Sequence, residues 1–133
     1  MPKYSQRSLA RLKECDDRLV TLFMNVIKKY DCSILVGHRS EADQNEAYDQ
    51  RRSKVQWPDS KHNKKPSLAV DAVRYERGID WDDTKGHYHF AGYVKGIADA
   101  MGISIRCGCD WDGDNQLKDQ SFNDLIHFEL VDK

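Results

Sequence analysis

Apolar residues recur every three or four positions near the start of the chain, which is the spacing of one face of an α-helix. This pattern predicts one amphipathic helix over residues 8–30, with Ser8 or Ser5 as its N-cap. A short apolar run over residues 33–37 follows and predicts a buried strand. The apolar positions of the predicted helix are Leu9, Leu12, Leu19, Phe23, Val26, Ile27 and Tyr30.

A second helix is predicted between Ser40 and about Arg52. Serine is a favoured N-cap residue, and the helical spacing places Ala47 and Tyr48 toward the interior. Residues 53–67 are polar and show no apolar periodicity, so they are predicted to form a long loop. Long ordered loops in small domains are often functional.

The second half of the chain alternates between short apolar runs and polar loops. Helical spacing predicts one further helix, from about His89 to Met101, which ends before Gly102. Helices and hairpin-like strands in mixed order predict an α+β fold, with helices packed on a small antiparallel sheet. No repeat or linker divides the chain, so residues 1–133 are predicted to form one domain. The strands predicted in this half cover residues 68–73, 103–106 and 126–131.

The composition excludes several classes of protein. The 133 residues are 39% hydrophobic, and 21 Lys and Arg nearly balance 22 Asp and Glu. A net charge of −1 argues against a general nucleic-acid binder, which usually carries a basic face. No apolar run approaches the roughly 20 residues of a membrane-spanning helix. The first residues also lack the apolar stretch of a secretory signal peptide, so we expect a cytoplasmic protein that does not insert into membranes.

The four cysteines are interpreted as free thiols. A chain without a secretory signal normally keeps its cysteines reduced. Cys107 and Cys109 are separated by a single residue, which is closer than the usual spacing of a zinc-binding cysteine pair. The other two are Cys15 and Cys32.

Two short segments contain the residues best suited to bind a metal ion. The first, residues 60–71, contains His62 and Asp71, and the second contains His127. Two histidines and one carboxylate, with a fourth position left open for water, form the usual ligand set of a catalytic zinc site. Asp124 stands three residues before His127 and offers the carboxylate that a metal-activated water needs as its base.

The predicted strands can bring these ligands together. If the strand that carries Asp71 lies beside the strand that carries His127, the two side chains can meet on one face. His62 can then fold over from the preceding loop, and Asp124 lies just before the last strand, close to the same point.

Two further charged residues can assist such a site. Arg39 follows the first predicted strand and can bind a substrate carboxylate or stabilise the charge that develops on a carbonyl oxygen. A structural ion pair with Glu41 or Asp43 is its alternative role. Glu129 shares one strand face with His127, and it is interpreted either as orienting a ligand or as ending in solvent.

Ordered motifs span the chain from the first helix to the C-terminus, and they comprise residues 37–40, 60–63, 66–71 and 124–129. Together with Gln44 and Tyr48 they resemble the zinc L-alanyl-D-glutamate peptidases of phage endolysins, which are related to the D-Ala-D-Ala peptidases. The resemblance covers essentially the whole chain.

The resemblance implies a function and a set of site residues. His62, Asp71 and His127 would bind Zn²⁺, Asp124 would be the catalytic base, and Arg39 would assist at the scissile carbonyl. The implied activity is hydrolysis of the L-Ala–D-Glu bond in the stem peptide of peptidoglycan, which lyses the bacterial cell. We expect a monomer that stays in the cytoplasm of the host cell until it is released to the cell wall.

Other functions remain open from the residues alone. A D-Ala-D-Ala dipeptidase or carboxypeptidase would use the same zinc site. A zinc-stabilised wall-binding module would use the metal without needing Asp124 as a base. A nuclease of the His-Asn-His type is suggested by His62 and Asn63, but the near-neutral charge argues against it.

Rival metal sites are weaker. His87 and His89 are two residues apart at a helix start and therefore point to different sides. The acidic loop over residues 107–123 does not match an EF-hand, but Asp110, Asp112, Asp114 or Asp119 can still offer a looser Ca²⁺ site. Lys61, Lys64 and Lys65 could contact an anionic cell wall, but they are interpreted as ordinary solvated charge near the site.

Overall fold

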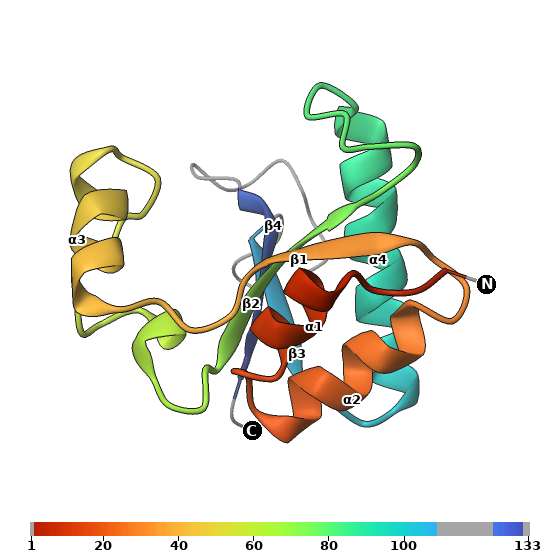
Figure 1. Cartoon of the computed structure of the whole chain (residues 1–133). Coiled ribbons are helices and arrows are strands. Elements are labelled where there is room, and N and C mark those ends of the chain that lie inside the picture. The colour runs from red at the N-terminus through yellow and green to blue at the C-terminus, as the bar shows by residue number, and fades with distance from the viewer. Residues whose placement is uncertain (1, 109–123, 132–133) are drawn as a thin grey trace.

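The computed structural model describes residues 2–108 and 124–131. Within these ranges, four strands form an antiparallel sheet in the order β1-β2-β4-β3 (Figure 1). The helices are α1 (Gln6–Leu12), α2 (Asp17–Val26), α3 (Glu41–Asp49), the 3-10 helix η1 (Lys61–Asn63) and α4 (Thr84–Ala100); the strands are β1 (Cys32–Val36), β2 (Ala69–Arg74), β3 (Ile105–Gly108) and β4 (Asp124–Leu130). The predicted α+β fold with a small antiparallel sheet is confirmed.

The hydrophobic core lies between the sheet and two of its helices. Helices α2 and α4 contact each other, and α4 also contacts β2, β3 and β4. Phe128 of β4 lies at the centre, with its ring edge-on to Phe23 of α2 at 5.7 Å and to Phe90 of α4 at 6.1 Å. Helix α3 stands apart on the other side of the sheet (Figure 1). The sheet face opposite the core is therefore free to carry polar side chains.

The predicted helix over residues 8–30 is wrong in one respect, because the structure divides it into α1 and α2. Asp16 ends the continuous pattern: its side chain accepts a hydrogen bond from the backbone N–H of Arg18 and caps α2. The backbone N–H of Asp16 also donates to the carbonyl of Ser67 at 2.8 Å. The N-cap of α1 is Ser5. Ser8 instead accepts a hydrogen bond from the backbone N–H of Ile34 and joins α1 to the edge of β1.

Other predicted elements are correct in type and shifted in position. Each predicted strand is present, displaced by one or two residues. Ser40 caps α3 as predicted and Ala47 is buried, but Tyr48 is 38% exposed, so its inward placement was wrong. Helix α4 begins at Thr84 rather than near His89, because Asp83 caps it by accepting from the backbone N–H of Gly86.

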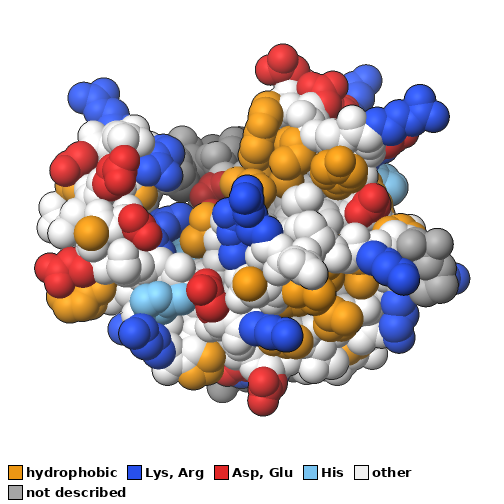
Figure 2. Space-filling view, in the orientation of Figure 1, with side chains coloured by type: hydrophobic (Ala, Val, Ile, Leu, Met, Phe, Trp, Pro, Cys, Tyr) orange, Lys and Arg blue, Asp and Glu red, His pale blue; other side chains and the backbone are white. Residues whose placement is uncertain are grey.

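The surface carries both signs of charge. Figure 2 shows Lys and Arg side chains interspersed with Asp and Glu over the visible face, without a broad basic field on that face. Among the described residues, no helix combines the length and the apolar character needed to cross a membrane. Cys15 and Cys32 are free thiols, as predicted, and both are buried, as is Cys107; Cys109 lies outside the described residues.

Candidate metal centre

His62 is positioned by the short helix η1. Ser60 and Asn63 form a capping box around this helix. The Ser60 side chain accepts a hydrogen bond from the backbone of the first turn, and the Asn63 side chain accepts one from the backbone N–H of Ser60. The cap turns His62 inward, where it is 1% exposed. Its Nδ1 atom lies 2.8 Å from the carbonyl oxygen of Gly37. Because a carbonyl can only accept, Nδ1 carries the proton and Nε2 faces the site.

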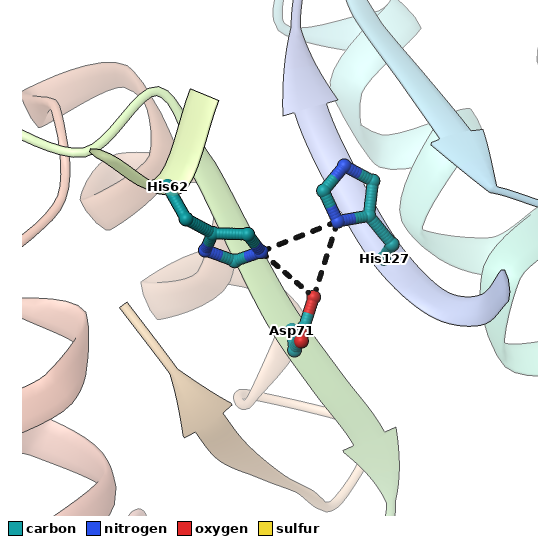
Figure 3. A group of neighbouring side chains, drawn as sticks. All are labelled: His62, Asp71 and His127. Carbon is teal, nitrogen blue, oxygen red and sulfur yellow. Dashed lines mark hydrogen bonds and ion pairs between the residues drawn. The ribbon is translucent and has the colours of Figure 1, made fainter. Parts of the chain in front are cut away.

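Asp71 and His127 meet because β2 and β4 are neighbours. The two residues are directly paired in the antiparallel register, on the sheet face opposite the core. Asp71 Oδ1 lies 3.1 Å from His62 Nε2 and 3.2 Å from His127 Nδ1, and the two ring nitrogens are 3.3 Å apart. Figure 3 shows the three side chains pointing toward one another from η1, β2 and β4. The predicted convergence of these three residues is confirmed.

The three atoms have the spacing and chemistry of a metal site. A tetrahedral metal with bonds of about 2.0–2.1 Å places its ligand atoms about 3.3–3.4 Å apart, and the observed separations are 3.1–3.3 Å. All three residues are buried, and together they form a group that can hold a metal ion. Two imidazoles and one carboxylate favour zinc over Ca²⁺ or Mg²⁺, which prefer oxygen ligands. The residues present therefore fit Zn²⁺.

Asp71 and His127 shift each other's pKa in opposite directions. Burial alone would raise the pKa of Asp71, but the charge of His62 and hydrogen bonds to both histidines hold it well below its usual value. Burial alone would lower the pKa of His127, yet hydrogen bonds to Asp71 and Glu129 raise it to about 9. A metal ion must therefore displace a proton from His127, and its affinity falls as the pH falls.

Asp124 lies beside this cluster at the start of β4. Burial and the charge of Asp71 raise its pKa, whereas the charges of His127 and His62 lower it, so its carboxyl group interacts with all three residues of the cluster. An irregular register puts it there: Cys107 pairs with Phe128, whereas the next residue, Gly108, pairs with Asp124. A Cβ atom on Gly108 would lie 2.2 Å from the Asp124 carbonyl oxygen, so only glycine permits this approach. The sequence analysis did not identify Gly108 as part of the site.

Arg39 reaches the site from the segment between β1 and α3. One guanidinium nitrogen lies 3.4 Å from Asp71 Oδ2, and the other donates to Gln44 Oε1 at 3.1 Å. The alternative ion pair with Glu41 or Asp43 is wrong, since the ion-pair partner within the described residues is Asp71. Arg39 thus contributes a fixed positive charge at the edge of the three-residue cluster.

The buried carboxylate of Glu129 contacts the outer side of the cluster. Its Oε1 atom lies 2.8 Å from His127 Nε2, and its Oε2 atom lies 2.7 Å from a guanidinium nitrogen of Arg106. Lys61 also reaches Oε2, at 3.3 Å, and bonds the carbonyl of Leu130. The prediction that Lys61 is ordinary solvated charge is therefore wrong. Lys64 and Lys65 are exposed, as predicted.

The rival metal ligands do not converge. His89 Nδ1 pairs with the Tyr30 hydroxyl at 2.8 Å, whereas His87 is buried beside Trp81, and their different surroundings agree with the predicted divergence. Within the described residues, only His62, Asp71 and His127 form a group that can hold a metal. The Ca²⁺ site suggested for Asp110, Asp112, Asp114 and Asp119 lies outside the described residues.

Comparisons with known proteins agree with this geometry. The family described as phage L-alanyl-D-glutamate peptidase matches residues 1–131. The crystal structure of the L-Ala D-Glu endopeptidase ChiX of Serratia marcescens matches with a TM-score of 0.76 at 24% identity, over 98% of this chain and 91% of ChiX. The LD-carboxypeptidase LdcB matches with a TM-score of 0.58 at 22% identity, over 90% of this chain and 58% of LdcB. At these identities the two structures establish a shared fold. No protein with curated annotation matches the chain.

Proposed function

Because the chain belongs to the phage L-alanyl-D-glutamate peptidase family, we propose that it is a zinc-dependent peptidase that hydrolyses the L-Ala–D-Glu bond of peptidoglycan stem peptides. The convergence of His62, Asp71 and His127 within 3.1–3.3 Å carries the zinc part of this proposal. Zinc bound there supplies a Lewis acid that acidifies a water molecule and polarises the scissile carbonyl.

Asp124 is proposed as the general base. Its carboxyl group is half-buried beside the three proposed ligands and interacts electrostatically with each of them. From that position it accepts a proton from the attacking water and later returns the proton to the leaving amine. A base of this kind is needed for turnover and would be superfluous in a protein that only binds the wall.

Arg39 is proposed to stabilise negative charge. Its guanidinium group is held by Gln44 and Asp71, so it is aimed at the site before substrate arrives. Two positions on a guanidinium can donate to an oxyanion as the tetrahedral intermediate forms. The group is thus preorganised to assist where charge develops on the carbonyl oxygen.

In the cell, the proposed role is that of a phage endolysin that causes bacterial lysis. The enzyme would act as a monomer on stem peptides, after release from the cytoplasm through a membrane lesion. A carboxypeptidase or D-Ala-D-Ala peptidase activity is the second candidate, favoured by the fold that the chain shares with the LD-carboxypeptidase LdcB. A zinc-stabilised wall-binding module is the third.

Mass spectrometry of digested peptidoglycan tests the proposal. Purified sacculi are incubated with the zinc-loaded protein, and a matched sample receives a chelator. We expect new L-Ala carboxyl ends and D-Glu amino ends that disappear on chelation. Release of a terminal D-Ala instead would support the second candidate. Intact stem peptides in the presence of bound zinc would reject the peptidase and favour the wall-binding module.

A further inference from the structure

Glu129 is a buried carboxylate that the proposed chemistry leaves without a role. It lies on β4 two residues after His127, so both side chains project from the same face of the strand. The Glu129 side chain is only 8% exposed. A carboxylate in such a place is costly unless each of its oxygens is hydrogen-bonded or paired with a charge. Its partners therefore indicate what it does.

Both oxygens of Glu129 are engaged, and by different elements. Oε1 faces the ring of His127, with 2.8 Å to Nε2. Oε2 faces two cations, Arg106 of β3 at 2.7 Å and Lys61 of η1 at 3.3 Å. The two cations on one oxygen hold the carboxylate in one orientation, with the other oxygen directed at the histidine.

This arrangement selects which nitrogen of His127 can bind a metal. An ionised carboxylate only accepts hydrogen bonds, so the proton on Nε2 is retained. The nitrogen of His127 that faces the cluster is then Nδ1, which lies 3.2 Å from Asp71 Oδ1 and 3.3 Å from His62 Nε2. At His62 the Gly37 carbonyl fixes the opposite choice, with the proton on Nδ1 and Nε2 facing the site. The two ligating rings thus present different nitrogens.

We propose that Glu129 is the positioning residue of the metal centre, and that Lys61 and Arg106 hold it so that His127 ligates through Nδ1. The inference rests on the proposed zinc site, which Glu129 does not itself join. It gives a function to the contact between β3 and β4, because Arg106 joins the sheet edge to the carboxylate that orients a ligand on the neighbouring strand.

Zinc affinity of Glu129→Gln is the first test. Glutamine keeps the shape of the side chain and removes its charge. Its amide group can donate as well as accept a hydrogen bond, so it no longer fixes the proton of His127 on Nε2. Partners of this kind typically contribute 10- to 100-fold in metal affinity, and we expect a zinc dissociation constant raised by about that factor. The matched control is Glu76→Gln, which removes a carboxylate paired with an arginine at 2.6 Å on the exposed surface; its zinc affinity should stay within about twofold.

The wild-type protein provides a second test that does not depend on a variant that folds. Imidazole ¹⁵N resonances of the ¹¹³Cd-loaded protein report which nitrogen of each histidine is bonded to the metal. We expect metal coupling at Nδ1 of His127 and at Nε2 of His62, with the Nε2 proton of His127 retained. Coupling at Nε2 of His127 would overturn the inference.

The outcomes separate this inference from the proposed function. A wild-type protein that binds neither zinc nor cadmium would reject both. A wild-type protein that binds zinc, cleaves stem peptides and keeps the same zinc affinity in Glu129→Gln would reject only the role of Glu129. The role of Glu129 would be supported by Nδ1 ligation in the wild type together with weaker zinc binding in both Glu129→Gln and Glu129→Asp. The aspartate variant should also bind weakly, because its shorter side chain cannot span from Arg106 to His127.

Discussion

At the scale of single residues, each of the three proposed ligands is held by a contact on the side that faces away from the centre of the cluster. The Gly37 carbonyl holds His62, and Glu129 holds His127. Asp71 uses one oxygen for the cluster and has the other 3.4 Å from Arg39. Such outer contacts fix the orientation of metal ligands and reduce the entropy that is lost when the metal binds. The ligands are therefore close to their bound arrangement before any metal arrives.

The residue that tests the chemistry most directly is Asp124. Asp124→Asn should lower the rate of stem-peptide cleavage by about 10²–10⁴-fold, the usual contribution of a positioned acid or base. Zinc content should stay unchanged, because Asp124 is outside the three-ligand cluster. Cleavage kinetics and metal analysis on the same preparation measure both quantities.

The matched control for this prediction is Asp99→Asn, which removes an exposed carboxylate on α4. It should leave the cleavage rate unchanged. An Asp124→Asn enzyme that retains activity within about tenfold of wild type would remove Asp124 from the role of base.

At the scale of elements, the irregular pairing of β3 with β4 places the candidate base. After Cys107 pairs with Phe128, the register shifts and Gly108 pairs with Asp124. A regular ladder would put Asp124 and His127 on opposite faces, since residues three apart in a strand point to opposite sides. The irregularity thus allows Asp124 to lie beside the cluster that contains His127, and bulges are frequent beside active sites.

Gly108→Ala should disturb this arrangement. The added Cβ would lie 2.2 Å from the carbonyl oxygen of Asp124 and 2.7 Å from its Cβ, so the backbone must shift. We expect a loss of about 1–3 kcal/mol in unfolding free energy and a larger loss in cleavage rate than in zinc affinity. Urea denaturation, kinetics and zinc titration measure the three effects.

Gly96→Ala is the control for that substitution. Gly96 lies on α4, and a Cβ there meets no atom within 4 Å. Alanine favours a helix interior by roughly 0.8–1.0 kcal/mol over glycine, so this variant should be as stable as wild type or more so and fully active. Equal behaviour of the two alanine variants would show that Gly108 does not position Asp124.

Much of the site followed from sequence because its residues lie in short local motifs. His62, Asp71 and His127 could be identified as candidate ligands by residue type, and the structure brings them together. Strand alternation correctly placed Glu129 on the face of His127. Gly108 could not be found this way, since its importance depends on a strand that lies beside it only after folding.

Element boundaries were harder to predict where tertiary contacts compete with local pattern. The apolar spacing over residues 8–30 is continuous, but a hydrogen bond from Asp16 to Ser67 divides it into two helices. The apolar periodicity of a segment indicates which face is buried, but it contains no information about a contact with a distant loop. The early start of α4 has the opposite cause, because the cap by Asp83 is local and was overlooked.

At the scale of the whole molecule, the core and the site occupy opposite faces of one thin sheet. Successive residues of β2 alternate between them, so Val70 and Ala72 enter the core while Asp71 joins the ligands. A change in core packing that shifts the backbone of β2 would therefore also move Asp71. Two of the buried core groups, Cys15 and Cys32, are also titratable.

These two thiols make the fold sensitive to alkaline pH. Burial raises the pKa of both to about 12, against an ordinary value of 9.0. Above pH 9 the unfolded chain releases these protons and the folded chain keeps them, so stability falls as the pH rises toward 12. Each thiol should contribute a loss of about 1.4 kcal/mol at pH 10. Urea denaturation at pH 8 and pH 10, with chelator present, measures the change.

The double variant Cys15→Ala and Cys32→Ala isolates this effect. The two thiols are present only in the wild type, so the difference between the two pH dependences reports their contribution. The variant should start less stable at pH 8 because two buried groups become smaller, yet lose less stability on going to pH 10. Parallel losses in the two proteins would contradict the assignment.

The sheet order has a consequence for how the protein becomes active as it folds. Strands β1 and β2 are close in sequence and can pair early, which brings His62 and Asp71 together. The third ligand comes from β4, and closing so long a loop is slow compared with forming local contacts. A chain in which β4 has not yet paired would hold only two of the three proposed ligands. In the proposed zinc enzyme, tight metal binding and activity would therefore begin only when β4 enters the sheet.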